Sequence, residues 1–240
     1  MCVPTNSSPL RILAVWGSEC GGTKKETQQL VEGWETTEKY VVTVLEGDKA
    51  ADKFDQITVE NYDLLVVLTS SFGDGDPPTG FGKFLYKMYE SAKDGKKAFA
   101  GLEHAVLGFG STHYYTFQNV PRLCDRLLEE SGSRRCLMRK EIDEMEELSD
   151  NVESIKVWNS SFVKYCNEKK SSATTKIASE SVCKWTEPES EVFEKKLGPD
   201  GYDLGSGPAV SPVAIFAVIG VAVAAFAYFK FVKDGTEEAA

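Results

Sequence analysis

Short apolar runs alternate with helical patterns along residues 10–167 of the chain. Five runs predict β-strands, at 11–16, 40–45, 64–69, 105–108 and 134–138. Four segments have the apolar spacing of helices, at 23–34, 81–91, 121–130 and 150–166. The runs at 64–69 and 105–108 are apolar without alternation, as in strands that helices cover on both faces. Repeated strand–helix alternation therefore predicts an α/β fold with a doubly wound, five-stranded parallel sheet in the order 2-1-3-4-5.

The alternating pattern stops after Cys166. Residues 168–212 are rich in Lys, Ser, Glu, Gly and Pro, which is typical of a flexible linker. Residues 213–229 carry no charged side chain, and Lys230 can extend its amine toward water, so the apolar span reaches Val232. A helix of that length measures about 30 Å, the thickness of the hydrocarbon layer of a membrane.

This pattern predicts five parts of the chain: a tail at 1–9, a globular domain at 10–167, a linker at 168–212, a transmembrane helix at 213–232 and a short tail at 233–240. A buried core helix is the alternative for the apolar segment. A soluble domain rarely carries a helix that is so uniformly apolar at its end, and this favours the membrane.

Composition limits the partners, metal sites and cellular environment that can be expected for the protein. Its 240 residues carry a formal net charge of −10, which argues against nucleic acid as a partner and favours cationic surfaces on other proteins. The six cysteines form no C-x-x-C pair and there are two histidines, so no metal site is expected. A reduced, cytosolic environment is the simplest interpretation.

The two ends of the sequence predict its orientation at a membrane. The N-terminus lacks a charged start followed by a long apolar core, so no signal peptide is expected. A C-terminal anchor then leaves the domain in the cytosol, although Lys230 and Lys233 favour the opposite orientation by the positive-inside rule. The endoplasmic reticulum is the favoured membrane, and the mitochondrial outer membrane is the alternative.

The segment WGSECGGTKKE, residues 16–26, joins a predicted strand to a predicted helix. Gly17 and Gly22 have the spacing of the nucleotide P-loop, G-x-x-x-x-G-K-[ST], but Thr23 and Lys24 follow in the reversed order. What remains is a set of backbone N–H groups at a helix N-terminus with hydroxyl side chains beside them. Such a site suits a phosphate monoester without a metal, and an ordinary strand-to-helix turn is the alternative.

Two further loops follow predicted strands at the same edge of the sheet, where ligands of such folds bind. One is TSSFGDGDPPTG, residues 69–80, and the other is GFGSTHYYTFQN, residues 108–119. Phe72 and Tyr114 place aromatic rings on these loops, which favours a flat ring bound face-on. That the aromatics only fill core space is the weaker alternative, because loops after parallel strands are exposed.

These loops resemble the FMN domain of the diflavin reductases, a family that includes the microsomal NADPH–cytochrome reductase, nitric oxide synthase and the sulfite reductase flavoprotein. TSSFGDGDPPTG resembles the family pattern T-S-x-[FY]-G-x-G-D-P-P, VLGFGSTHYYTF resembles V-F-G-L-G-N-x-x-Y-x-x-F, and GSECGGTKKE resembles G-S-Q-T-G-T-A-E-E. The resemblance covers residues 10 to about 167 and implies a flavodoxin-like fold with FMN as cofactor. No counterpart of the NADPH- and FAD-binding half is expected in this chain.

By this resemblance, the residues around the FMN phosphate are Ser18, Glu19, Cys20, Gly21, Gly22 and Thr23. The residues around the isoalloxazine ring are Ser70, Ser71, Phe72 and Gly73, together with Phe109, Gly110, Ser111, Thr112, His113, Tyr114, Tyr115, Thr116, Phe117 and Gln118. Asp143 lies near the last acidic flavin contact of the family. Phe72 and Tyr114 are expected to stack on the two faces of the isoalloxazine. Cys20 and Gly22 replace hydroxyl residues of the family, so the phosphate loses two side-chain donors, and Ser111 replaces Asn. No catalytic residue is expected.

Together with the predicted anchor, the resemblance implies a membrane-bound electron carrier, a component of an oxidoreductase system rather than a complete enzyme. It would take electrons from a separate NAD(P)H-dependent reductase and pass them singly to a haem or iron–sulfur protein. The acidic run at 140–150, with Asp74 and Asp76, is expected to dock basic partners, and a solvated face is the alternative. Two other functions stay open: a flavin-poor module that recruits basic partners to a membrane, and a small quinone reductase.

Overall fold

The computed structural model describes residues 8–35, 38–170, 197–198 and 201–202. The chain divides into two units, 1–203 and 204–240, and the second lies outside the described residues. No helix within the described ranges is both long and apolar enough to cross a membrane. The predicted span at 213–232 and most of the predicted linker lie outside those ranges, so both stay predictions.

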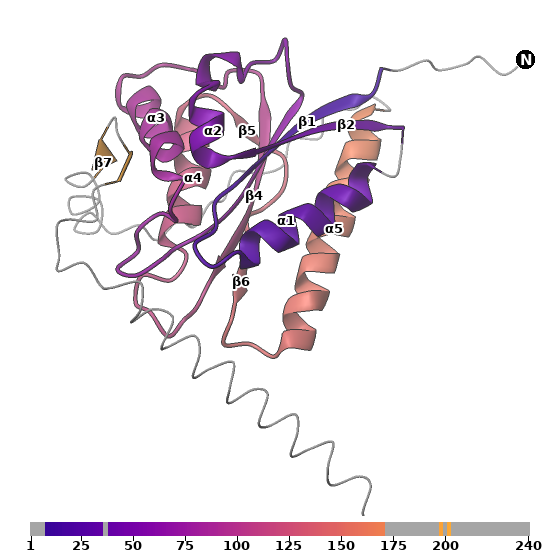
Figure 1. The fold of residues 1–240 in the computed structure, drawn as a ribbon. Helices are drawn as coiled ribbons and strands as arrows, with labels where there is room; N and C mark the ends of the chain where they lie inside the picture. The colour runs from indigo at the N-terminus through magenta and orange to yellow at the C-terminus, as the bar shows by residue number, and fades with distance from the viewer. Residues whose placement is uncertain (1–7, 36–37, 171–196, 199–200, 203–240) are drawn as a thin grey trace, which may run out of the picture. The chain divides into compact units, whose positions relative to one another are not determined.

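A parallel sheet of six strands forms the centre of the domain (Figure 1). The strands are β1 (Leu10–Trp16), β2 (Tyr40–Glu46), β3 (Leu64–Ser70), β4 (Glu103–Gly110), β5 (Arg134–Arg135) and β6 (Lys140–Asp143). Their order β2-β1-β3-β4-β5, with β6 also paired to β4, confirms the predicted order 2-1-3-4-5.

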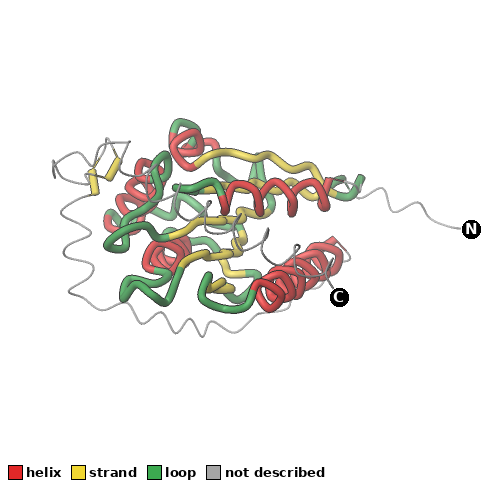
Figure 2. The backbone as a smooth tube through the Cα atoms, turned by 60° about the horizontal axis from the view of Figure 1, so that its bottom comes forward, coloured by secondary structure: helices red, strands yellow, loops and turns green. Residues whose placement is uncertain are grey.

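Helices cover both faces of this sheet, as the tube in Figure 2 shows. On one face lie α1 (Gly22–Glu35) and α5 (Leu148–Lys170), and on the other lie α2 (Gly47–Ala51), α3 (Gly82–Lys93) and α4 (Asn119–Glu130). The short α2 and the 3-10 turn at Phe54–Gln56 were not predicted, since five and three residues are too few to show a helical period.

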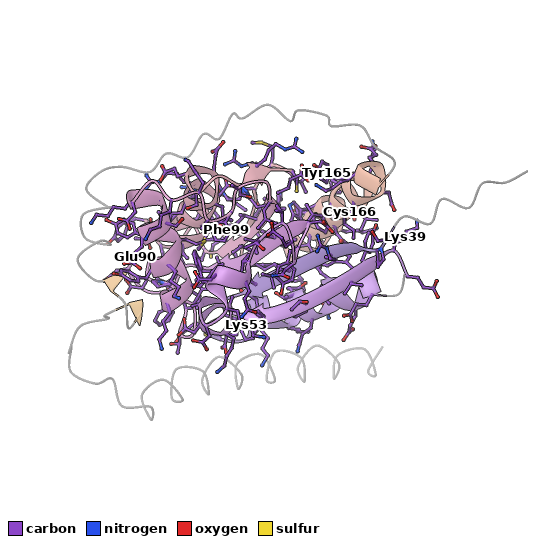
Figure 3. The ribbon with its side chains drawn as sticks, turned by 90° about the horizontal axis from the view of Figure 1, so that it is seen from above. Lys39, Lys53, Glu90, Phe99, Tyr165 and Cys166 are labelled. Atoms are coloured by element: carbon purple, nitrogen blue, oxygen red, sulfur yellow. The ribbon has the colours of Figure 1, made fainter. Side chains whose placement is uncertain are left out.

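Alternation along the central strands divides the core into two clusters. Leu65 and Val67 of β3 pack toward α2, α3 and α4, whereas Val66 and Leu68 pack toward α1 and α5. Figure 3 labels Phe99, which belongs to the cluster under α2, α3 and α4, and Cys166 of α5, which belongs to the cluster under α1 and α5. Both faces of β3 and β4 are therefore buried, which explains their uninterrupted apolar runs.

The edge of the sheet differs from the prediction. A single strand at 134–138 was expected, but the chain forms β5 and β6 with a break between them, and both pair with β4. The break exposes Met138 and turns the Arg139 side chain inward, where its Nη1 lies 2.6 Å from Asp125 Oδ2. The break between the two edge strands therefore coincides with an ion pair to α4, and an apolar pattern cannot show such a pair.

Asp125 of α4 is the centre of a buried ionic network. Its Oδ1 accepts a hydrogen bond from Arg135 Nε at 2.8 Å and lies 3.2 Å from His104 Nε2. His104 is buried, and its Nδ1 lies 2.9 Å from Ser133 Oγ. Burial lowers the pKa of His104 despite the opposing effect of Asp125, so the imidazole is neutral and donates its Nε2 proton to the carboxylate. The network fixes α4 to the edge of the sheet.

A short antiparallel hairpin lies within the predicted linker. It pairs β7 (Leu197–Gly198) with β8 (Gly201–Tyr202). A Cβ placed on Gly201 would lie 3.6 Å from Lys83 Cγ, so the hairpin approaches the first turn of α3.

Candidate functional site

A cavity of about 830 Å³ opens at the carboxyl ends of the parallel strands. The loops after β1, β3, β4 and β6 all contribute to its wall, together with the first turns of α1 and α5. This is the position where doubly wound sheets bind ligands, because neighbouring strands send their connections to opposite faces there and leave a crevice.

The loop after β1 forms one end of the cavity. A Cβ on Gly17 would lie 2.6 Å from the Phe81 ring and 2.8 Å from Thr69 Oγ1, so only glycine fits at the base of this loop. Gly21 has φ +87, a left-handed conformation that glycine adopts without strain. The loop leads directly into α1, whose first N–H groups have no partner within the helix and can bind an anion.

Glu19 is the one acidic residue of this loop, and Thr79 forms hydrogen bonds with both of its carboxylate oxygens. Its Oε2 accepts a hydrogen bond from Thr79 N at 2.7 Å, and its Oε1 lies 3.3 Å from Thr79 Oγ1. The pair connects the loop after β1 to the loop after β3. Glu19 therefore joins two walls of the cavity, and the N–H groups of α1 stay available to a negatively charged ligand.

The loop after β3 presents Phe72 from a tight hairpin. Phe72 N donates to Asp76 O, and Asp76 N donates to Phe72 O, both at 2.8 Å. Gly73 and Gly75 have φ values of +51 and +94, which the turn requires. The Phe72 side chain is 43% exposed although it is aromatic, and it borders the cavity.

Three hydrogen bonds hold this hairpin against the loop after β4 and the start of α4. Asn119 Nδ2 donates to Gly75 O at 2.9 Å, and Val120 N donates to Ser71 Oγ at 2.9 Å. Thr116 Oγ1 donates to Gly73 O at 3.4 Å. Because two different loops are fixed to each other, the position of Phe72 depends on residues more than 40 positions away in the sequence.

The loop after β4 presents Tyr114 on the same cavity. Tyr114 is 54% exposed, and its ring packs edge-on against His113 with the ring centroids 5.5 Å apart. Phe72 and Tyr114 thus offer two uncovered aromatic rings from two loops, while the loop before α1 offers backbone N–H groups. An uncovered aromatic pair next to an anion site suits a phosphorylated flat ring such as FMN.

Most of the residues predicted for the site do line this one cavity. They are Ser18, Glu19, Cys20, Gly22, Thr23, Ser70, Ser71, Phe72, Gly73, Phe109, Gly110, Ser111, Tyr114, Thr116 and Phe117. Six predicted residues do not border it: Gly21, Thr112, His113, Tyr115, Gln118 and Asp143.

Two of these six support the wall from behind. Gln118 is buried with φ +62, and its Nε2 donates to Ile142 O of β6 at 3.1 Å. Asp143 Oδ1 accepts hydrogen bonds from Thr112 N and Met145 N, both at 3.0 Å. Slight burial raises the pKa of Asp143, but its hydrogen bonds with Thr112 and Met145 outweigh this, so the pKa is lowered. Asp143 is a carboxylate that connects two loops.

The sequence pattern missed the part of the wall contributed by β6, α1 and α5. These residues are Lys25, Glu26, Ile142, Glu144, Glu146, Leu148, Asn151 and Ile155. The edge strand was expected to end at residue 138, so the loop that brings this segment to the cavity was not recognised. The segment KEIDE at 140–144 carries a single apolar residue, Ile142, and this is too short a pattern to predict a strand.

The rim of the cavity is acidic. Glu144 and Glu146 line the cavity and are exposed, and Asp74 and Glu147, which are next to lining residues in the sequence, are also exposed. Asp76, in contrast, is 7% exposed, so it adds little to the charged surface, contrary to the expectation from sequence.

Comparison with known proteins agrees with this geometry. Residues 15–158 match the family described as Flavodoxin. The flavoprotein alpha-component of NADPH sulfite reductase from Mannheimia succiniciproducens is 31% identical over 141 residues, which are 58% of this chain and 22% of that protein. Methionine synthase reductase from Mus musculus is 34% identical over 82 residues, which are 32% of this chain and 12% of that protein. The chain thus spans less than a quarter of the length of these relatives.

Solved structures show the same fold at low sequence identity. Oxidised flavodoxin 1 from Bacillus cereus superposes with a TM-score of 0.51 at 20% identity, over 64% of this chain and 97% of that one. A variant of the flavodoxin from Pseudomonas aeruginosa superposes with a TM-score of 0.52 at 19% identity, over 66% of this chain and 99% of that one.

Proposed function

The chain belongs to the flavodoxin family, and on that basis we propose that it is a carrier of single electrons. It receives them from a separate NAD(P)H-dependent reductase and passes them to a haem or iron–sulfur protein. The observation that carries this proposal is the cavity, where two uncovered aromatic rings and the open N-terminus of α1 meet. FMN is the cofactor of the family, and it supplies reversible one-electron chemistry when bound.

The residues of the cavity suit the two ends of this cofactor. Ser18, Thr23 and the N–H groups of α1 would hold the phosphate, and Phe72 and Tyr114 would hold the ring. The departures at Cys20 and Gly22 remove hydroxyl donors but leave the backbone donors in place. Lys25 borders the same end of the cavity and adds a positive charge near the phosphate.

The acidic rim supports an electron acceptor with a basic surface. Glu144 and Glu146 border the cavity and are exposed, and the chain carries a net charge of −10. Opposite charges steer two proteins together and orient them before contact, which brings the cavity mouth toward the partner. A short-lived complex of this kind suits a carrier, because it must separate after each transfer.

A reductive titration tests the proposed electron chemistry. The FMN-loaded protein is expected to take up two electrons in two resolved one-electron steps, followed by absorbance under anaerobic conditions. A single two-electron step would contradict the carrier proposal. Sustained NAD(P)H oxidation by the isolated protein would favour the quinone reductase instead, and failure to bind FMN would favour the interaction module.

We also propose that residues 213–232 anchor the protein in a membrane with the domain in the cytosol, on the endoplasmic reticulum in preference to the mitochondrial outer membrane. The support is the apolar sequence itself, which is long enough to cross the hydrocarbon layer. The domain at 10–167 has its own two-sided core, so its fold does not require this segment.

Deletion of residues 213–240 is expected to move the protein from the membrane fraction to the soluble fraction. FMN affinity should stay the same, because the cavity is built from residues before 156. Deletion of 233–240 alone is the matched control and should leave the protein in the membrane fraction. If the longer deletion aggregates while the full chain in detergent is folded, the apolar segment belongs to the core of the protein.

A further inference from the structure

Asn151, in the first turn of α5, has a buried side-chain oxygen without a partner. The residue is 8% exposed and borders the cavity beside Ile142 and Ile155. Its Nδ2 donates to Asp143 O at 2.6 Å, whereas no described residue donates to its Oδ1. A buried acceptor without a donor is unfavourable, so a donor supplied by a ligand would stabilise this position.

The orientation of this carboxamide follows from the carbonyl group that it faces. If the amide turned over, Oδ1 would face Asp143 O, and two acceptors would oppose each other. The backbone at Asp143 is itself fixed, since the Asp143 carboxylate accepts hydrogen bonds from Thr112 N and Met145 N. Asn151 therefore keeps Nδ2 at the Asp143 carbonyl, and Oδ1 is the atom without a partner in a residue that borders the cavity.

The position of Asn151 indicates which part of a ligand it would meet. Helices α1 and α5 cover the same face of the sheet, and Trp34 Nε1 of α1 donates to Asn159 Oδ1 of α5 at 2.7 Å. Asn151 thus belongs to the wall on the side of α1, and Phe72 belongs to the loop after β3. A ligand with its phosphate at α1 and its ring at Phe72 has its connecting chain along the wall between them.

We propose that Asn151 is a further cofactor-binding residue, whose Oδ1 accepts a hydrogen bond from a hydroxyl group of the ribityl chain of FMN. The assignment rests on the proposed FMN-binding function. It follows from the chemistry of the ligand, because the ribityl chain is rich in hydroxyl donors and a phosphate dianion has none. Because Oδ1 is buried in this structure, the contact requires the carboxamide to turn toward the cavity when FMN binds.

Three ligands distinguish this contact from other roles of Asn151. FMN has phosphate, ribityl chain and ring, riboflavin lacks the phosphate, and lumiflavin lacks both phosphate and ribityl chain. Fluorescence titration of Asn151→Ala and Asn151→Leu should show a Kd raised about three- to tenfold for FMN and riboflavin, as expected for one hydrogen bond. The Kd for lumiflavin should stay within about twofold of the parent protein. Leucine has the same number and branching of side-chain heavy atoms as asparagine, so it keeps the wall filled if alanine disturbs the fold.

Val152→Ala is the matched control, because Val152 is exposed, lies in the same helical turn as Asn151 and does not border the cavity. It should leave all three Kd values unchanged. Equal weakening of all three ligands by the Asn151 variants would overturn the assignment, because Asn151 would then only hold the turn at Asp143 or contact the ring. Unchanged affinity for all three would overturn it as well. Failure of the parent protein to bind FMN would instead overturn the proposed function.

Discussion

Replacement of Asp125 by asparagine is expected to lower the free energy of unfolding by about 3–5 kcal/mol. Asp125 is 1% exposed and accepts hydrogen bonds from Arg135 and Arg139 at 2.8 and 2.6 Å. The amide has the same shape but no charge, so it leaves the buried Arg135 guanidinium without its closest counter-ion. Denaturant unfolding of the ligand-free protein measures the loss.

Glu130→Gln in the same helix is the matched control. Glu130 pairs with Arg126 at 3.6 Å, and its side chain is 50% exposed, so the expected loss is below about 0.5 kcal/mol. If Asp125→Asn were no more destabilising than this control, the buried network would have no role in stability.

The pH dependence of stability provides a second measurement on the same pair of proteins. Burial raises the pKa of Asp125, but the hydrogen bonds from His104 and Arg135 outweigh it, so the folded-state pKa is below the ordinary value. A group with a depressed folded-state pKa contributes stability above its unfolded pKa, about 3.9, and loses it as the pH falls through the folded-state value. The difference in the free energy of unfolding between the parent protein and Asp125→Asn should therefore become smaller below about pH 4.

Removal of either aromatic ring at the cavity should weaken FMN binding by about 1–3 kcal/mol, which is the range for stacking of a flat ring on an aromatic side chain. Phe72→Ala and Tyr114→Ala each delete a ring that is about half exposed, at 43% and 54%. Their truncation should therefore cost little folding free energy, and the change in affinity reports the contact with the ligand. Quenching of flavin fluorescence measures it.

Tyr115→Ala is the control for these two variants. Tyr115 is 83% exposed and does not border the cavity, although it neighbours Tyr114 in the sequence. We expect its removal to change FMN affinity by less than about 0.5 kcal/mol. Unchanged affinity in both Phe72→Ala and Tyr114→Ala would remove the two rings from the site.

Which residues support the site could not be derived from the sequence. The loop at 69–80 and the loop at 108–119 are recognisable by their Gly, Pro and aromatic content, but their mutual contacts are not. Asn119 reaches Gly75 and Glu19 reaches Thr79 because the parallel sheet brings distant loops to one edge. Tyr115 and Gln118 show that neighbours in a motif can have different environments, because Tyr115 is exposed outside the cavity and Gln118 is buried.

By itself, the sequence determined the type and order of the main elements, because apolar periodicity reports which faces are covered by helices. It also identified the two aromatic loops and the helix start after β1, where short stretches of chain define the local chemistry. Only the tertiary structure decided the break between β5 and β6 and the contribution of α5 to the cavity. Both depend on how separate elements meet in space: Arg139 pairs with Asp125 of α4, and Asn151 of α5 lines the same cavity as Phe72 of the loop after β3. No local pattern encodes such an arrangement.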